Sequence, residues 1–399
     1  MLQNDQNNIC RLRISRIQAR VKKEKLDAII IIKPQNVYYL SGFNPIIQSH
    51  PSSVLLSSHG EAFLIIHSLR FIHAKKEAFI DEIRLFGKWG KYGENAPKDF
   101  LTTVTKTLQE LSLSGQLRIG LEFSYFPFSL FLKFKSLLPD TEFLDIDAII
   151  REERMIKDEI EIGYIKDAAC IADAGMKAAI DFVRKRKTEI EVSVKAMIKM
   201  KNVWKNKFPN REAVDFGTSE GGVFNALWAY CLSGPRMNLM CDSPSSRSIK
   251  KGDLVLVVIW TAINGYHAEN ERTIAVAPIE LEQEKAYNVI LRARSEAIKE
   301  IRPGIPISKI YNVAAAIMRE EGYGDILPGR IGHGLGLGAH EAPSISSDNS
   351  CLLKEGMVLS FEPALRLGQL GGIQHSDTIL VNSNGFDYLT HTARGFLNV

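Results

Sequence analysis

Strand-like apolar runs separated by helical segments constrain the fold of the second half of this chain. These runs fall at residues 253–260, 273–277, 357–361 and 378–381. Between them, residues 281–321 have a helical pattern that the sequence PGIP interrupts at residues 303–306. Strands spread along a chain with helices inserted between them are typical of a curved, mainly antiparallel sheet backed by helices. The sequence therefore predicts an α+β architecture for this part.

The N-terminal part predicts a smaller α/β domain with several strands and covering helices. Residues 28–32 are a fully apolar run that Pro34 ends, which is typical of a buried strand. Residues 36–43 are expected to continue as short strands and turns. Because 399 residues exceed one ordinary core, two domains are expected, and we place them at residues 1–148 and 149–399.

A long charged pattern lies between these two parts. Residues 151–180 read REERMIKDEIEIGYIKDAACIADAGMKAAI and contain no proline. Helix formers dominate the segment, so we interpret it as one long helix that joins the two domains.

Composition narrows the classes of partner. The 50 basic and 46 acidic residues give a net charge of only +4. The one basic run, RKRK at residues 184–187, is short and is interpreted as a solvated helix face rather than a phosphate-binding patch. The polar start MLQNDQNN has no signal core, and no apolar run approaches the ~20 residues of a membrane span. Five scattered cysteines argue against a disulfide framework. We expect a cytoplasmic protein that binds neither nucleic acid nor membrane.

A glycine-rich run carries the first candidate chemistry. Residues 332–343 read GHGLGLGAHEAP and contain His333, His340 and Glu341 in a segment whose glycines allow close backbone approach. Further along, GMVLSFEP places Glu362 at the end of an apolar strand. Histidines and carboxylates that converge from separate strands indicate either a metal site or an acid–base site.

These motifs resemble those of the creatinase, aminopeptidase P and prolidase superfamily, which has the pita-bread fold. The opening LDAIIIIKPQNVYYLSGF resembles the family's N-terminal domain. IKKGDLVLVVIWTAINGYHAENERT, GHGLGLGAHEAP, KEGMVLSFEP and GGIQHSDTILV then follow in the family's order and spacing. The resemblance covers nearly the whole chain and implies a creatinase-type N-terminal α/β domain followed by a pita-bread domain. Relatives commonly dimerise, so it also implies a homodimer.

The resemblance implies a metal site that this chain has partly lost. Metallopeptidases of the superfamily hold two metal ions with two aspartates, one histidine and two glutamates, and these positions fall here on Val258, Glu269, His333, Glu362 and Ser376. Valine offers no lone pair and serine is a weak neutral ligand, whereas hard cations need carboxylate oxygens. Glu269, His333 and Glu362 could still hold a single divalent metal with an open coordination position.

A second comparison, with the metal-free creatinase branch, favours no metal at all. GYHAENERT places Glu271 where creatinase carries its functional glutamate, and Glu269 and Glu271 share one face of a strand. Paired carboxylates raise the pKa of one of them, although either could instead pair with a nearby basic residue. The histidine that serves as acid–base group in creatinase falls on Cys241, and its arginine anchor is missing from a loop that offers only His50.

From these residues we expect a metal-independent hydrolase that cleaves a C–N bond of a small amide, amidine or cyclic substrate. His333 would be the general acid–base group, Glu271 and Glu362 would orient the substrate, and His340 would stabilise an oxyanion or carry a proton. The expected substrate-binding residues are Glu269, Cys241, His375, Ser376, His50 and Trp260.

Several alternatives remain open at this point. The chain could be a one-metal Xaa-Pro peptidase, or a non-catalytic binding protein on the same fold. His340 could be a loop histidine bonded to backbone, and Cys241 is more simply a small buried apolar residue. His375 and Ser376 are neighbours on a strand, so only one of them can face the site.

Overall fold

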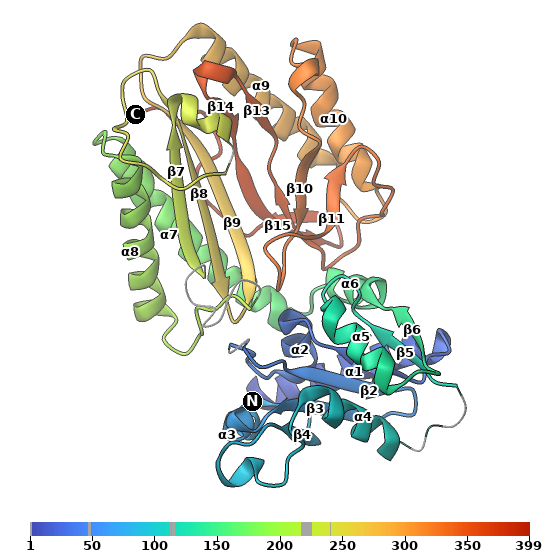
Figure 1. The fold of residues 1–399 in the computed structure, drawn as a ribbon. Coiled ribbons are helices and arrows are strands. Elements are labelled where there is room, and N and C mark those ends of the chain that lie inside the picture. Colours follow the sequence, from blue (N-terminus) through green and yellow to red (C-terminus); the bar gives the residue numbers. More distant parts are fainter. Residues whose placement is uncertain (1, 47–48, 112, 114–115, 217–225, 240) are drawn as a thin grey trace. The chain divides into compact units, whose positions relative to one another are not determined.

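The computed structural model describes residues 2–46, 49–111, 113, 116–216, 226–239 and 241–399. The chain forms two compact units, one of residues 1–154 with 216–222 and the other of residues 155–215 with 223–399. Figure 1 shows both units, and each is described by itself below. None of the described helices is long and apolar enough to cross a bilayer.

The first unit contains a mixed six-stranded sheet in the order β4-β3-β2-β1-β5-β6. Its strands are β1 (Ala28–Ile31), β2 (Ser53–Ser57), β3 (Ala62–His67), β4 (Ile83–Phe86), β5 (Arg118–Leu121) and β6 (Glu142–Asp145). The buried strand β1 pairs antiparallel with β2 and parallel with β5. The apolar run at residues 28–32 therefore occupies the centre of this sheet, as a strand buried on both faces does.

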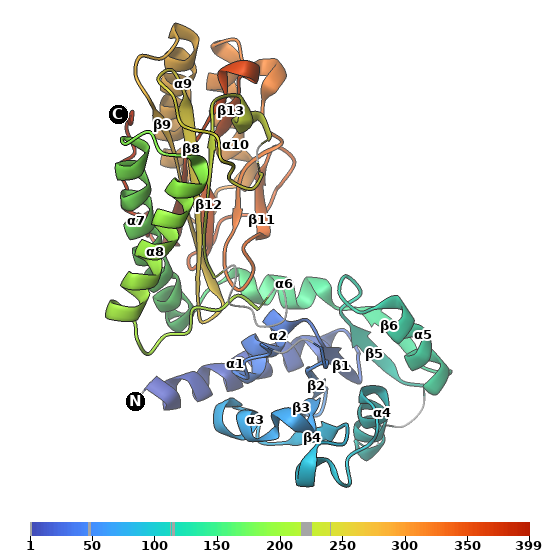
Figure 2. The same ribbon diagram turned by 60° about the vertical axis from the view of Figure 1, so that its left-hand side comes forward.

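Helices cover this sheet (Figure 2). They are α1 (Leu2–Lys23), α2 (Pro34–Ser41), α3 (Phe71–Glu77), α4 (Phe100–Glu110), α5 (Phe128–Leu137) and α6 (Asp147–Met155). The expectation of strands and turns at residues 36–43 is wrong, because α2 occupies most of that segment. Pro34 begins the helix at a position that needs no N–H donor, and Gly42 ends it with a left-handed φ of 69°.

The second unit is built on a sheet in the order β11-β10-β12-β15-β9-β8-β7, with β16 paired to β15. Its strands are β7 (Leu227–Ser233), β8 (Leu254–Ile263), β9 (Tyr266–Ala275), β10 (Arg330–Gly334), β11 (Glu341–Ser346), β12 (Val358–Phe361), β15 (Ser376–Asn382) and β16 (Gly385–Tyr388). A separate short hairpin joins β13 (Ala364–Arg366) to β14 (Gly372–Gln374). All pairings in this sheet are antiparallel, which confirms the predicted fold class.

Four long helices back this sheet: α7 (Glu159–Val183), α8 (Glu189–Lys207), α9 (Leu281–Ala297) and α10 (Ile307–Glu320). Helix α7 contacts β8 and β9, α8 contacts β7, and α10 contacts β11 (Figures 1 and 2). The single helix expected over residues 151–180 is instead two helices, α6 and α7. Asp158 accepts backbone N–H groups at the start of α7 and forms a capping box with Glu161, so a new helix begins there.

Candidate functional site

The register of the central strands gathers several candidate residues in rows on one face of the sheet. In the β8–β9 hairpin, Val258 lies opposite Glu271 and Trp260 lies opposite Glu269. On the other side of β9, Ser376 of β15 lies opposite Glu271. Because directly paired residues of antiparallel strands project to the same face, these five side chains share that face.

The strands β10 and β12 bring His333 and Glu362 to this group. The N–H of His333 donates to the Ser360 hydroxyl at 3.1 Å, and the N–H of Glu362 donates to the carbonyl of Ile331 at 2.9 Å. Gly332 permits this close pairing, since a Cβ there would collide with the carbonyl oxygen of Ser360. The glycine beside His333 is thus needed for strand packing rather than for ligand binding.

Glu269, His333 and Glu362 converge into a cluster. His333 Nε2 lies 3.5 Å from Glu269 Oε2 and 3.4 Å from Glu362 Oε1. One ligand atom from each of the three residues lies within 4.8 Å of the others. The side chains of Glu269 and His333 are almost fully buried, while that of Glu362 is 13% exposed. This group has the residue types and the spacing that one divalent cation requires.

The hydrogen bonding of the cluster also fits a single cation. His333 Nδ1 lies 3.0 Å from the Gly334 carbonyl oxygen, which assigns the ring proton to Nδ1 and leaves the lone pair of Nε2 available. Among the described residues, neither His333 Nε2 nor Glu269 Oε1 has a hydrogen-bond partner, although both atoms are buried. Buried polar atoms without partners are rare, so these two indicate a ligand.

A second cation does not fit the described residues in the same way. A second ion would lie beside Glu271, where the neighbouring positions across the sheet are Val258 and Ser376. Val258 is completely buried and has no donor atom. The cluster is therefore suited to one metal ion rather than two.

Excess negative charge dominates the electrostatics of the site. Burial, and then the charge of Glu269, raise the pKa of Glu271 well above its ordinary value. Burial, followed by the charges of Glu269 and Glu271, does the same to the pKa of Glu362. Burial also opposes ionisation of Glu269, but the attraction of the neighbouring His333 ring outweighs burial and lowers the pKa of Glu269. A bound cation would relieve this repulsion between the carboxylates.

His340 and Trp260 form one wall of the cluster. The ring of His340 lies 4.3 Å from that of His333 and 5.0 Å from that of Trp260, measured between centroids. Desolvation, and then the charge of His333, lower the pKa of His340 to about 4. Its imidazole is therefore neutral near pH 7 and can donate or accept a hydrogen bond at the edge of the site.

Two further residues lie at the site, Arg366 and Gln374, and neither was predicted from the sequence. Gln374 Nε2 donates to Glu271 Oε2 at 2.6 Å, and Arg366 donates to Gln374 Oε1 at 2.5 Å. Arg366 belongs to the short strand β13, which is separate from β12, so strand alternation from Glu362 could not place it. Only the β13–β14 pairing reveals that Arg366 and Gln374 meet.

His375 is not brought to the cluster, whereas Ser376 is. The side chain of Ser376 shares the face of Glu271, so His375 projects from the other face of the strand. There it is fully buried, with Nε2 2.9 Å from the Tyr287 hydroxyl of α9. This contact is a packing contact between sheet and helix.

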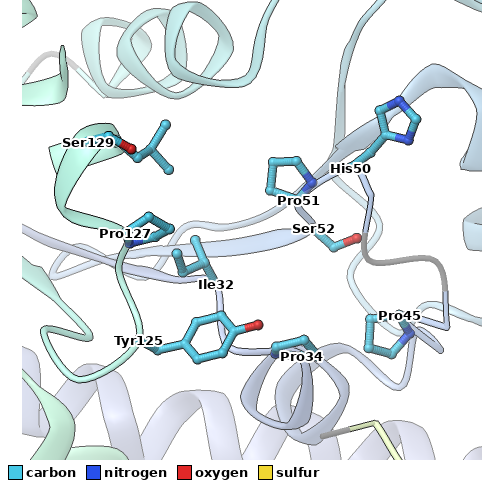
Figure 3. Close-up of a pocket in the computed structure, with 10 residues that line it drawn as sticks. Ile32, Pro34, Pro45, His50, Pro51, Ser52, Tyr125, Pro127 and Ser129 are labelled. Atoms are coloured by element: carbon cyan, nitrogen blue, oxygen red, sulfur yellow. The ribbon is translucent and has the colours of Figure 1, made fainter. Parts of the chain in front are cut away.

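Cys241 and His50 are not members of the cluster of Glu269, His333 and Glu362. Cys241 is exposed, so its interpretation as a buried apolar residue is wrong, and its sulfur lies 3.5 Å from the Tyr230 hydroxyl. His50 belongs to the first unit, where it lines a pocket of about 380 Å³ together with Tyr125 and four prolines. Figure 3 shows His50 beside Pro51 at this pocket.

Known proteins with similar sequences and folds support a peptidase. Residues 163–383 match the model of metallopeptidase family M24, and residues 13–156 match that of the creatinase/prolidase N-terminal domain. The Xaa-Pro dipeptidase of Pyrococcus furiosus is 31% identical over 385 residues, which cover 96% of this chain and 99% of that protein.

Two solved structures extend the likeness to the whole fold. The prolidase from Pyrococcus horikoshii OT3 aligns with a TM-score of 0.80 at 30% identity, covering 96% of this chain and 99% of that one. The X-Pro aminopeptidase from Thermotoga maritima aligns with a TM-score of 0.79 at 26% identity, covering 97% of this chain and 99% of that one.

These likenesses correct one prediction from the sequence. The expected metal-independent hydrolase of a small C–N substrate is contradicted, because the matching family is one of metallopeptidases and the similar proteins are Xaa-Pro dipeptidases. The expectation that no metal is bound has no support either, since metal use is a property of that family. That prediction gave the missing ligands at Val258 and Ser376 more weight than the retained Glu269, His333 and Glu362.

Proposed function

Because the chain belongs to metallopeptidase family M24 and carries a creatinase/prolidase N-terminal domain, we propose that it is a single-metal peptidase acting on Xaa-Pro dipeptides. Its membership of that family places it among the hydrolases. The observation that carries the proposal is the convergence of Glu269, His333 and Glu362, whose ligand atoms lie within 4.8 Å of one another. The prolidase-like relatives supply the class of substrate, a small dipeptide.

In this proposal, Glu269, His333 and Glu362 are the three protein ligands. When bound, a divalent ion supplies Lewis-acid polarisation of the scissile carbonyl. His333 presents Nε2 to it because its Nδ1 proton is held by the Gly334 carbonyl. A site with three protein ligands would leave room at the ion for the substrate, as in other catalytic metal sites.

The other residues act on the substrate and its protons. Glu271 takes the proton of the attacking water and returns it to the leaving nitrogen, while Gln374 fixes its Oε2 atom. His340 donates a hydrogen bond to the oxygen that becomes negative in the tetrahedral state. Trp260 packs against His340 and excludes water from that side, and Ser376 lies beside Glu271. Cys241, which contacts the Tyr230 hydroxyl, is proposed to contact the substrate farther from the metal ligands.

The proposal extends to the assembly and the boundaries of the protein. We propose a cytoplasmic homodimer, with a first domain at residues 1–148 and a catalytic domain at residues 149–399. Two observations support the domain boundaries: the match of residues 13–156 to a distinct N-terminal domain, and the division of the chain into two units. The homodimer is proposed from the resemblance to the superfamily alone.

A direct test measures metal content and turnover together. Protein purified without chelator should contain about one divalent ion per chain and should hydrolyse Ala-Pro faster than Ala-Ala after loading with Mn²⁺ or Co²⁺. His333→Ala should lose the ion and reduce kcat/KM at least about 100-fold. His391, whose side chain is 72% exposed, provides the matched control, so His391→Ala should change neither quantity. Less than about a tenth of an ion per chain, with no Xaa-Pro hydrolysis, would refute the proposal.

A further inference from the structure

Arg366 is a buried cation whose hydrogen bonding is incomplete. It ends β13, where it pairs with Gly372, and one of its terminal nitrogens donates to Gln374. Its Nε and the other terminal nitrogen are buried and have no hydrogen-bond partner among the described residues. A guanidinium with dry, unpaired donors costs free energy unless nearby negative charge compensates for it.

The compensating charge lies in the metal cluster. The electrostatic partners of Arg366 include Glu271 and Glu362, and Gln374 links it directly to Glu271 by two successive hydrogen bonds. Arg330 is a second arginine near Glu362, but it is exposed, so solvent screens its charge. Arg272 is also buried and acts on Glu271, but its terminal nitrogens already donate to Asp377 and to backbone carbonyl oxygens. Of these three arginines, Arg366 is therefore the one that is buried near the cluster without a carboxylate partner of its own.

The charges of the site balance with Arg366 included. Glu269, Glu271 and Glu362 carry three negative charges when ionised, and one divalent ion neutralises only two of them. Glu271 lies in the row of Val258 and Ser376, where no further carboxylate could help to hold a second ion. The guanidinium lies on the same side of the cluster, joined to Glu271 through Gln374.

We propose that Arg366 is the second cation of this site: it neutralises Glu271 from a fixed position, so that the site takes one divalent ion and one guanidinium. This inference rests on the proposed single-metal function. It makes Arg366 a positioning residue that sets the affinity and the number of metal ions. It also gives Gln374 a role, because the amide holds the guanidinium and the carboxylate at a fixed separation.

Titration of metal-stripped protein with Mn²⁺, followed by calorimetry, tests the inference without measuring turnover. Arg366→Gln removes the charge but can keep a hydrogen bond to Gln374. Because a neighbouring positive charge repels the ion, its removal should tighten binding on the order of tenfold or more. Arg366→Lys keeps the charge and should bind Mn²⁺ as the wild type does. Arg330→Gln, the exposed control, should change the affinity by less than about threefold.

The possible results separate this inference from the proposed function. Wild-type protein that binds no ion would overturn both. If the wild-type protein binds one ion and Arg366→Gln binds Mn²⁺ with the same or a weaker affinity, the inference is wrong but the proposed function is not. A raised KM for Ala-Pro with unchanged Mn²⁺ affinity would also overturn it, because Arg366 would then be a substrate anchor. If Arg366→Gln does not fold, Gln374→Leu can be used instead, because it removes the amide that links Arg366 to Glu271. Gln374→Leu should alter the Mn²⁺ affinity, and an unchanged affinity would overturn the inference.

Discussion

Replacing Val258 by aspartate should make the stability of the protein depend on divalent metal. Val258 is fully buried and lies directly opposite Glu271 across the β8–β9 hairpin. Loss of the buried valine costs about 1.5–3 kcal/mol. An uncompensated buried carboxylate costs about 3–5 kcal/mol more, since the facing side chain is another acidic residue, Glu271, and not a cation. The expected loss of at least about 5 kcal/mol corresponds to a Tm lower by roughly 10–20 °C in a unit of this size.

Divalent metal should reverse most of this loss, because the new carboxylate completes a second site with Glu269 and Glu271. An ion present at about 1,000 times its Kd stabilises the folded state by about 4 kcal/mol. Thermal denaturation with and without Mn²⁺ measures the effect. Asparagine has nearly the same shape as aspartate but no charge, so Val258→Asn should be destabilised and Mn²⁺ should not restore its stability to a comparable extent. The reasoning fails if Val258→Asp melts at the wild-type temperature without metal, or if Mn²⁺ rescues both variants equally.

Two further predictions concern the framework around the site. Burial opposes ionisation of Asp377, but the charges of Arg272, Arg294 and Arg394 outweigh burial and hold the pKa of Asp377 below its ordinary value. The ionised carboxylate therefore stabilises the fold above about pH 4, and this stabilisation is lost as the pH falls further. Urea denaturation of Asp377→Asn should therefore show a loss of about 3–5 kcal/mol at pH 7 that shrinks below pH ~4; an equal loss at both pH values would contradict this. Asp158→Ala removes the capping box of α7 and should lower the free energy of unfolding by about 1 kcal/mol. Asp181→Ala, at an exposed position near the other end of α7, should stay within about 0.5 kcal/mol of wild type, and similar losses in both variants would argue against the cap.

The strands were predictable because their hydrophobic patterns are strong. The runs at residues 253–260 and 378–381 became β8 and β15, and the break at residues 303–306 separates α9 from α10. The errors occurred where capping chemistry overrides the pattern. Pro34 begins a helix in a segment rich in aromatic and β-branched residues, and Asp158 interrupts what reads as one continuous helix. In both places a single residue at a helix start decides the structure.

The candidate site was predictable in its residues but not in its geometry. His333 and Glu362 come from separate strands, so only the tertiary fold could show their 3.4 Å approach. Alternation along β15 indicated that His375 and Ser376 face opposite ways, but the register with Glu271 was needed to say which one faces the site. Arg366 was missed because no short motif surrounds it, and its importance depends on a contact with Gln374 in another strand.

The positions of the lost and retained ligands argue for a rebuilt site rather than a decayed one. Val258, Glu271 and Ser376 occupy one row across three paired strands, and Arg366 reaches that row through Gln374. Glu269, His333 and Glu362 form a separate cluster that remains complete, with the lone pair of His333 still directed toward both carboxylates. Random loss of function would scatter substitutions over both groups. Here the positions that lack a carboxylate, Val258 and Ser376, fall in one half only, whereas Glu269 keeps a carboxylate in the other half. A fixed cation lies beside the changed half, as expected of a site adapted to work with a single metal ion.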